Sequence, residues 1–178
     1  MHEQIEEVLI SQQEIQEKVK QLGSQLKDDY RDKNPLIICV LKGALIFVSD
    51  LIRAMDCPLS LDFMAVSSYG SSTKSSGVVQ ILKDLETGIE GRHVIIAEDI
   101  VDTGLTLNYL RNNLLSRDPA SLAICSLLDK PSRRQVKIKP DYCGFVIPDK
   151  FVVGYGLDFD QQFRNLPYIG ILKPEAYI

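Results

Sequence analysis

Three carboxylates and two threonines fall within nine residues near the middle of the chain. Glu98 and Asp99 follow the apolar run 94–97 directly, Asp102 lies three residues further on, and residues 103–106 (Thr-Gly-Leu-Thr) complete the group. Ionised carboxylates only accept hydrogen bonds, so Glu98 and Asp99 suit donors such as the two hydroxyls of a ribose. Asp102 stands between this pair and the polar loop, where it could exchange a proton with a third group.

The polar loop has the composition of an anion site. The β-branched run 94–97 predicts a buried strand, and leucines at helical spacing over 107–114 predict a helix directly after the loop. Ligands of parallel sheets lie beyond the carboxyl ends of strands, and the free N–H groups of a helix's first turn attract anions. Gly104 allows close backbone approach, and Thr103 and Thr106 add donors. Phosphate, ribose and proton transfer together indicate an enzyme that makes or breaks a nucleotide.

Two other interpretations of the acidic pair need weighing. It could be a solvated strand end, which is common for two acids taken alone, or the metal-binding strand of a P-loop nucleotidase. The chain contains no G-x-x-x-x-G-K-[ST] sequence, which argues against the nucleotidase. A solvated end does not account for the whole run from Glu98 to Thr106.

Strands and helices alternate around this stretch. Ser11 to Glu14 has a capping-box pattern, and the apolar stripe from Ile15 to Leu26 predicts an amphipathic helix. Further strands are expected at 8–10, 36–41, 59–65 (with one polar face), 78–82, 122–128, 142–147 and 151–153, and a helix from 45 to 52. This order predicts an α/β fold with a mainly parallel sheet flanked by helices, in a single domain over residues 1–178.

Composition narrows the class of protein. Apolar residues make up 45% and charged residues 25%, and the net charge of −4 argues against a broad nucleic-acid or membrane surface. The N-terminus lacks the regions of a signal peptide, so we expect a cytoplasmic protein without membrane partners. The four cysteines have no zinc-site spacing, and Cys39 and Cys125 fall in apolar runs as reduced core residues. We expect His2 and His93 to be structural.

Four other features have both an ordinary and a functional interpretation. Lys42-Gly43 could be a surface turn, and the polar, glycine-rich segment 67–77 could be an idle hairpin tip or a lid over substrate. Lys130 could be a salt-bridged surface lysine, and Phe151 could be core. The basic residues from Arg133 to Lys139 are interpreted as a solvated face.

Taken together, these features resemble one family. The run 93–110 resembles the phosphoribosyl pyrophosphate signature of the purine phosphoribosyltransferases, and the chain as a whole is similar to the hypoxanthine-guanine phosphoribosyltransferases. The similarity extends to residues 41–44, 67–70, Lys130 and 149–164 in the family's order. One departure is Ala44, where some members have a second glycine. The resemblance implies the phosphoribosyltransferase fold, with a small hood from the chain ends over the site.

The resemblance also implies roles for individual residues. Asp102 would be the catalytic base for the purine N7 proton. The implied pyrophosphate-binding residues are Lys42, Gly43, Ser68, Tyr69 and Arg164, with the Lys42 loop often built around an unusual peptide bond. The implied ribose- and phosphate-binding residues of the central run are Glu98, Asp99, Ile100, Asp102, Thr103, Gly104, Leu105 and Thr106. The implied purine-binding residues are Lys130, Phe151, Val152, Leu157 and Asp158. The implied ligands of Mg²⁺ are Glu98, Asp99 and Asp158.

The reaction implied is purine salvage, in which a phosphoribosyl group passes from phosphoribosyl pyrophosphate to hypoxanthine or guanine and gives IMP or GMP plus pyrophosphate. A homodimer or homotetramer is also implied. Two alternatives stay open. A sibling transferase that prefers xanthine would differ near Lys130, Phe151 and Leu157. A regulatory nucleotide- or RNA-binding protein on the same fold would need a basic face, against which the net acidity speaks.

Overall fold

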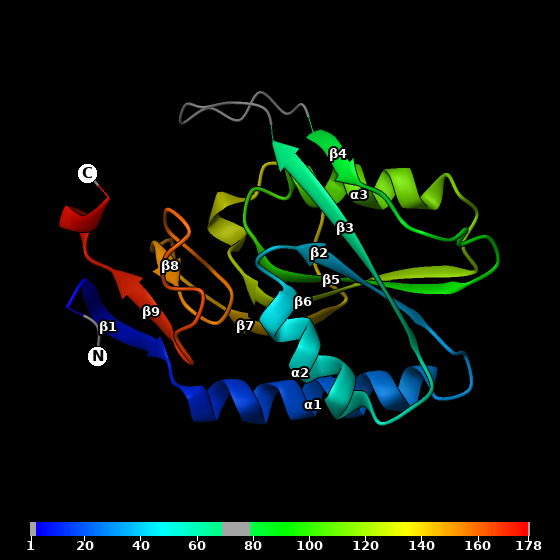
Figure 1. Ribbon diagram of the computed structural model, residues 1–178, viewed down its shortest axis with the longest axis horizontal. Helices are drawn as coiled ribbons and strands as arrows, with labels where there is room; N and C mark the ends of the chain where they lie inside the picture. The colour runs from blue at the N-terminus through cyan, green and yellow to red at the C-terminus, as the bar shows by residue number, and fades with distance from the viewer. Residues whose placement is uncertain (1–2, 69–78, 178) are drawn as a thin grey trace.

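Six strands form the central sheet of the computed structural model, which describes residues 3–68 and 79–177 (Figure 1). In spatial order they are β4 (Val79–Lys83), β3 (Ser60–Ser68), β2 (Leu36–Leu41), β5 (His93–Val101), β6 (Ser121–Asp129) and β7 (Tyr142–Val146). All neighbours are parallel except β3 and β4, which are antiparallel. The predicted α/β fold with a mainly parallel sheet is confirmed.

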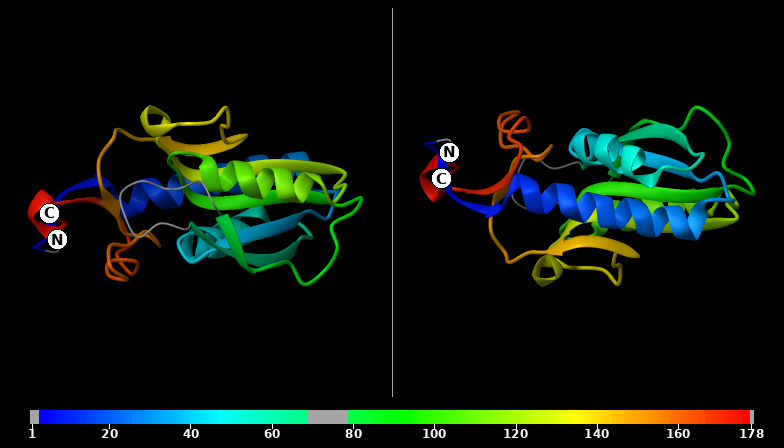
Figure 2. Two further views of the ribbon diagram at one scale, coloured as in Figure 1. Left: turned by 90° about the horizontal axis from the view of Figure 1, so that it is seen from above. Right: turned by 90° about the horizontal axis from the view of Figure 1, so that it is seen from below.

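The sheet is covered on both faces (Figure 2). Helices α1 (Gln12–Tyr30) and α2 (Leu45–Met55) pack with one face and α3 (Leu105–Leu115) with the other. Along β2, Ile37 and Cys39 join the α1–α2 core, whereas Ile38 and Val40 join the α3 core. Successive side chains of a strand point to opposite faces, so a strand buried on both faces needs an unbroken apolar run.

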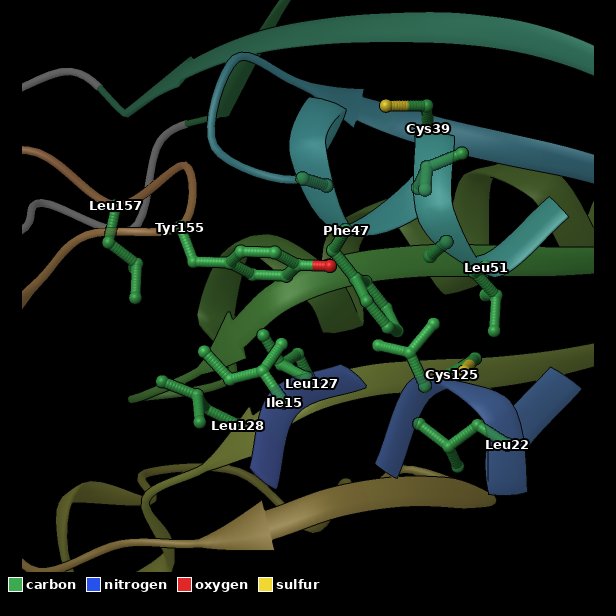
Figure 3. Packing of buried hydrophobic residues seen from close by; sticks show 14 of the residues in the cluster. Ile15, Leu22, Cys39, Phe47, Leu51, Cys125, Leu127, Leu128, Tyr155 and Leu157 are labelled. Carbon is green, nitrogen blue, oxygen red and sulfur yellow. The ribbon is translucent and has the colours of Figure 1, made fainter. Parts of the chain in front are cut away.

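The core beneath α1 and α2 is built from both helices and the sheet (Figure 3). Phe47 and Leu51 of α2, Ile15 and Leu22 of α1 and Cys125 of β6 belong to one cluster of buried side chains (Figure 3). The predicted capping box is present at the start of α1, where Ser11 and Glu14 bond reciprocally. Cys39 and Cys125 are buried thiols without a disulfide, as expected.

A second, three-stranded sheet forms the hood. Its order is β1 (Ile5–Ile10), β9 (Ile169–Leu172) and β8 (Val152–Val153), all antiparallel, so the two ends of the chain lie together beside the main sheet (Figure 1). Residues 142–147 and 151–153 had been predicted as the last strands, and this is wrong because β9 follows them. Two short 3₁₀ helices, η1 (Pro131–Arg133) and η2 (Pro174–Ala176), complete the described elements.

The predicted polar face of β3 does not face solvent. Asp62 is only 6% exposed, whereas Leu61 on the other face is 39% exposed. The Asp62 carboxylate accepts hydrogen bonds from the N–H groups of Phe63 and Glu86, and Lys83 lies 3.6 Å away. These partners offset the cost of burying its charge.

None of the helices in the described part of the chain is long and apolar enough to cross a bilayer.

Candidate active site

A small pocket of about 110 Å³ lies where β5 passes into α3. Gly104 is the N-cap residue with φ of 80°, and a Cβ there would come within 2.6 Å of Ile138 Cγ2, so a side chain is excluded on two grounds. Among the described residues, the N-cap positions of α3 and α2 make no side-chain capping bond, in contrast to Ser11 of α1, and only the Thr103 hydroxyl accepts a long hydrogen bond, 3.4 Å, from the N–H of Leu105. The start of α3 is therefore left open to an anion. The pocket is lined by Glu98, Ile100, Val101, Asp102, Thr103, Gly104, Thr106 and Leu107.

A larger pocket of about 410 Å³ adjoins the small one. It brings together six residues expected at the site with four that were not: Ile100, Asp102, Lys130, Phe151, Val152 and Leu157, joined by Arg133, Asp149, Lys150 and Tyr177. Ile100 and Asp102 line both pockets. Asp102 thus stands between a helix N-terminus and a half-apolar cavity of the size of a small-molecule site.

Arginines hold the Asp102 loop from two sides. Arg134 Nε donates to the carbonyl oxygen of Asp102 at 3.0 Å, and its Nη2 donates to that of Val101 at 3.2 Å and pairs with the Asp129 carboxylate. Its side chain is mostly buried, so the expected solvated basic face is wrong for Arg134. Arg133 Nε lies 3.3 Å from Asp102 Oδ1. That oxygen is buried and has no hydrogen-bond partner within the described chain.

Lys130 and Phe151 both depart from their ordinary interpretations. Lys130 is only 7% exposed, and its Nζ donates to the carbonyl oxygen of Lys150 at 2.8 Å. Phe151 is 39% exposed and therefore not core, and its ring stacks on Tyr177 with centroids 4.8 Å apart and planes at 20°. The larger pocket has a cation at one wall and an aromatic ring at another, which suits a flat polar heterocycle.

The Lys42–Gly43 loop meets the hood next to Asp99. The Leu41–Lys42 peptide bond is cis, as the resemblance implied. A Cβ on Gly156 would collide with the carbonyl oxygen of Gly43, so the two loops are in backbone contact. Arg164 Nη1 donates to the Gly156 carbonyl oxygen at 2.7 Å, and its Nη2 lies 2.7 Å from Asp158 Oδ1.

Glu98 and Asp99 serve opposite sides of β5. Adjacent strand residues point to opposite faces, so Glu98 reaches the small pocket while Asp99 reaches the Lys42–Gly43 loop. The sequence predicted that both residues follow the strand, and this is wrong because β5 extends to Val101 and includes them. Burial raises the pKa of Glu98 well above its usual range, and the negative Asp99 adds to this. Burial also raises the pKa of Asp99 to about 6, although hydrogen bonds and Arg164 oppose the shift.

Some expected residues lie elsewhere or outside the described residues. Asp158 does not line the larger pocket but pairs with Arg164 near Asp99. Leu105 begins α3 and lines neither pocket. Ser68 ends β3, and Tyr69, with the remainder of the expected lid to residue 77, lies outside the described residues.

The chain is similar in sequence to a known protein family. The family model described as "Phosphoribosyl transferase domain" matches residues 6–160. The chain belongs to the phosphoribosyltransferase family. A curated relative, the hypoxanthine-guanine phosphoribosyltransferase of Bacillus subtilis, is 58% identical over 99% of this chain and 98% of its own length. The hypoxanthine-guanine phosphoribosyltransferase of Lactococcus lactis is 53% identical over 97% of this chain and 94% of its own length.

A solved structure agrees with the family assignment. The crystal structure of a hypoxanthine phosphoribosyltransferase from Staphylococcus aureus superposes with a TM-score of 0.97, at 52% identity, covering 100% of this chain and 97% of that one. Within this phosphoribosyltransferase, the matched range includes both pockets except Tyr177. Sequence reasoning assigned no role to Arg133, Asp149, Lys150 or Tyr177. Arg133 lies in a run of basic residues that was interpreted as a solvated face, and Tyr177 lies after the last segment that resembles the family, which ends at residue 164.

Proposed function

We propose that this phosphoribosyltransferase is a purine salvage enzyme that transfers the phosphoribosyl group of phosphoribosyl pyrophosphate to hypoxanthine or guanine. The products are IMP or GMP and pyrophosphate. The observation that carries the proposal is the position of Asp102, which lines both the pocket at the start of α3 and the pocket with Lys130 and Phe151. The 5′-phosphate would occupy the first pocket and the purine the second.

The chemistry follows from where charge develops. The bond from ribose C1 to the pyrophosphate oxygen breaks, purine N9 bonds to C1, and the N7 proton of the purine passes to Asp102. Glu98 and Asp99 would hold the ribose hydroxyls while the ring becomes oxocarbenium-like, and Arg164 and Lys42 would bind the departing pyrophosphate. Lys130 would donate to the 6-oxygen of the base, which adenine lacks.

The carboxylates suit Mg²⁺, which we propose as the cofactor. Among the described residues, no three His, Cys, Asp or Glu side chains converge as a metal cage. Mg²⁺ needs none, because it is held through one or two carboxylates, substrate phosphates and retained waters. Asp99 and Asp158 lie near each other, and Glu98 and Asp99 have raised pKa values that a nearby cation would oppose. When bound with pyrophosphate, Mg²⁺ would neutralise charge on the leaving group.

An absorbance assay tests this function. The purified protein, phosphoribosyl pyrophosphate and Mg²⁺ are combined with hypoxanthine, guanine, xanthine or adenine, beside Asp102→Asn. We expect turnover of hypoxanthine and guanine, little with adenine, and a loss of roughly 10²–10⁴-fold in kcat for the variant. Xanthine as the fastest substrate would favour the sibling transferase. Absence of turnover with every base, while the donor still binds, would overturn the enzyme proposal.

Assembly and location stay predictions. We propose a homodimer or homotetramer acting in the cytoplasm on small molecules, without nucleic-acid or membrane partners. Light scattering after gel filtration tests the oligomeric state. Titration of labelled RNA at increasing salt tests for a nucleic-acid partner, since phosphate contacts would give a steep salt dependence.

A further inference from the structure

Four charged side chains of alternating sign line the larger pocket. Arg133 Nε lies 3.3 Å from Asp102 Oδ1, Arg133 Nη1 lies 3.9 Å from Asp149 Oδ1, and that same oxygen lies 3.8 Å from Lys130 Nζ. We call this series, Asp102–Arg133–Asp149–Lys130, the charge chain. Its two ends are the residues proposed to contact the purine, and its two middle members have no assigned role.

The charge chain joins three separate segments. Asp102 follows β5, Lys130 precedes η1 and Arg133 is its last residue, and Asp149 lies in the segment before β8. The N–H of Arg133 donates to the carbonyl oxygen of Lys130 at 3.2 Å, which fixes the position of Arg133 relative to Lys130. The Lys130 ammonium is held by the Lys150 carbonyl oxygen as well as by Asp149. The distance between Asp102 and Lys130, the two ends of the charge chain, is therefore fixed by backbone hydrogen bonds as well as by ion pairs.

Asp102 and Lys130, the two ends of the charge chain, can each bind the purine only if they do not pair with each other. Asp102 and Lys130 have opposite charges and line one pocket, and a direct ion pair between them would occupy the polar groups that a base needs. Among the ion pairs of the described residues, none joins these two directly; each is paired with a middle member instead. Ion pairs at half-exposed side chains such as Arg133 and Asp149 contribute little to stability. The two pairs therefore matter for the positions of Asp102 and Lys130 rather than for stability.

We propose that Arg133 and Asp149 are positioning residues that hold Asp102 and Lys130 at the spacing of the N7–C6 edge of a 6-oxopurine. This inference rests on the proposed function. Arg133 would orient Asp102 through Oδ1, the buried oxygen without a hydrogen bond, and leave Oδ2 for the N7 proton. Asp149 would hold Lys130 toward the 6-oxygen. A bound 6-oxopurine then closes the charge chain, because its N7–H donates to one end and its oxygen accepts from the other.

The test uses steady-state kinetics of Arg133→Met, Asp149→Asn, the double variant and Arg133→Lys. Arg31→Met is the matched control, because Arg31 is exposed on the far end of α1 and pairs with Asp28 at 2.6 Å. We expect Arg133→Met and Asp149→Asn each to lower kcat/KM for hypoxanthine about tenfold or more, with the KM for phosphoribosyl pyrophosphate within about twofold of wild type. The double variant should lose less than the product of the two single losses, since both act in one network. Arg133→Lys should recover part of the loss.

The outcomes separate the two proposals. A wild-type protein that turns over no purine would overturn the proposed function and this inference with it. An active wild type with unchanged Arg133→Met kinetics would overturn the inference alone. So would losses that multiply in the double variant, or that fall equally on the KM values of both substrates, as a general distortion would produce. Urea unfolding of each variant shows whether a loss comes from misfolding.

Discussion

The carboxylate of Asp99 occupies the space where a β-carbon on Gly43 would have to lie. The nearest atom to that point is Asp99 Oδ2, so the missing side chain of Gly43 is what lets the carboxylate reach the loop after β2. The same loop supports the hood through the contact between Gly156 and the Gly43 carbonyl oxygen. A single glycine therefore fixes the meeting point of three segments.

Gly43→Ala should displace Asp99 and the loop together. We expect the KM for phosphoribosyl pyrophosphate to rise and kcat/KM to fall by about 10²-fold, because a shift of about 1 Å in a positioned group has that effect. Gly88→Ala is the control, since a Cβ at Gly88 meets nothing within 4 Å. Steady-state kinetics of both variants decide the matter. Equal activity of the two would show that Asp99 can move aside without consequence.

Helices α1 and α2 are in close contact at Gly23. A Cβ there would lie 2.5 Å from Ala54 Cβ and 2.7 Å from the Ala54 carbonyl carbon. Gly23→Ala gains about 1 kcal/mol in helix propensity, but overpacking against backbone costs about 1–3 kcal/mol. We expect a net loss of unfolding free energy, measured in urea. Ser24→Ala, at the exposed neighbouring position, should leave stability nearly unchanged or slightly higher. A more stable Gly23→Ala would show that the helices can separate.

The ion pair between Asp84 and Arg117 gives a pH dependence of known sign. Both terminal nitrogens of Arg117 donate to the Asp84 carboxylate at 2.9 Å and lower its pKa from 3.8. The unfolded state therefore binds the proton first, so the stabilisation is present above about pH 4 and is lost as the pH falls further. Asp84→Asn should cost up to about 1 kcal/mol at pH 7, because the pair is partly exposed.

Urea unfolding of wild type and Asp84→Asn at pH 7 and pH 3 checks this. The difference in unfolding free energy between the two proteins should shrink at the lower pH. A difference that stays constant from pH 7 to pH 3 would mean that the carboxylate's charge contributes nothing and that only its shape matters.

The strands at the centre of the sheet could be predicted from sequence because their cause is local. The run 36–41 is apolar on both faces, and its predicted bounds match those of β2. β9 was missed because it has only four residues, includes Gly170, and pairs with β1 at the opposite end of the chain. The face of β3 that carries Asp62 was predicted to be polar but is buried. This could not be foreseen, because a partner of Asp62, the N–H of Glu86, comes from a later turn.

The same division applies to the candidate site. The pocket that Glu98, Asp102 and Thr103 line could be anticipated because loop, carboxylates and helix start follow one another in the chain, while the roles of these residues stay predictions. Arg134 could not, since its hydrogen bonds to Asp102 and Val101 exist only once η1 folds back on the end of β5. Nothing in its own sequence neighbourhood separates it from Lys137 or Lys139. The single-domain organisation over residues 1–178 stays a prediction.

Tyr177 extends the aromatic wall of the larger pocket. Its ring stacks on Phe151, and Phe159 meets Phe151 edge-on with centroids 5.7 Å apart. If Phe151 stacks on the purine, as proposed, removing the ring that stacks on Phe151 should leave Phe151 less firmly held without changing the reacting atoms. An aromatic pair contributes about 0.5–1.5 kcal/mol beyond its buried area, which corresponds to about a 2- to 10-fold change in affinity.

We therefore expect Tyr177→Ala to raise the KM for hypoxanthine by about 2- to 10-fold, with kcat and the KM for phosphoribosyl pyrophosphate nearly unchanged. Tyr177→Phe is the matched control, because it keeps the stacked ring and loses only the hydroxyl. Measuring both KM values for the two variants separates ring stacking from hydrogen bonding. If Tyr177→Ala and wild type have the same KM for hypoxanthine, Phe151 holds its position without support from Tyr177, and Tyr177 does not contribute to purine binding.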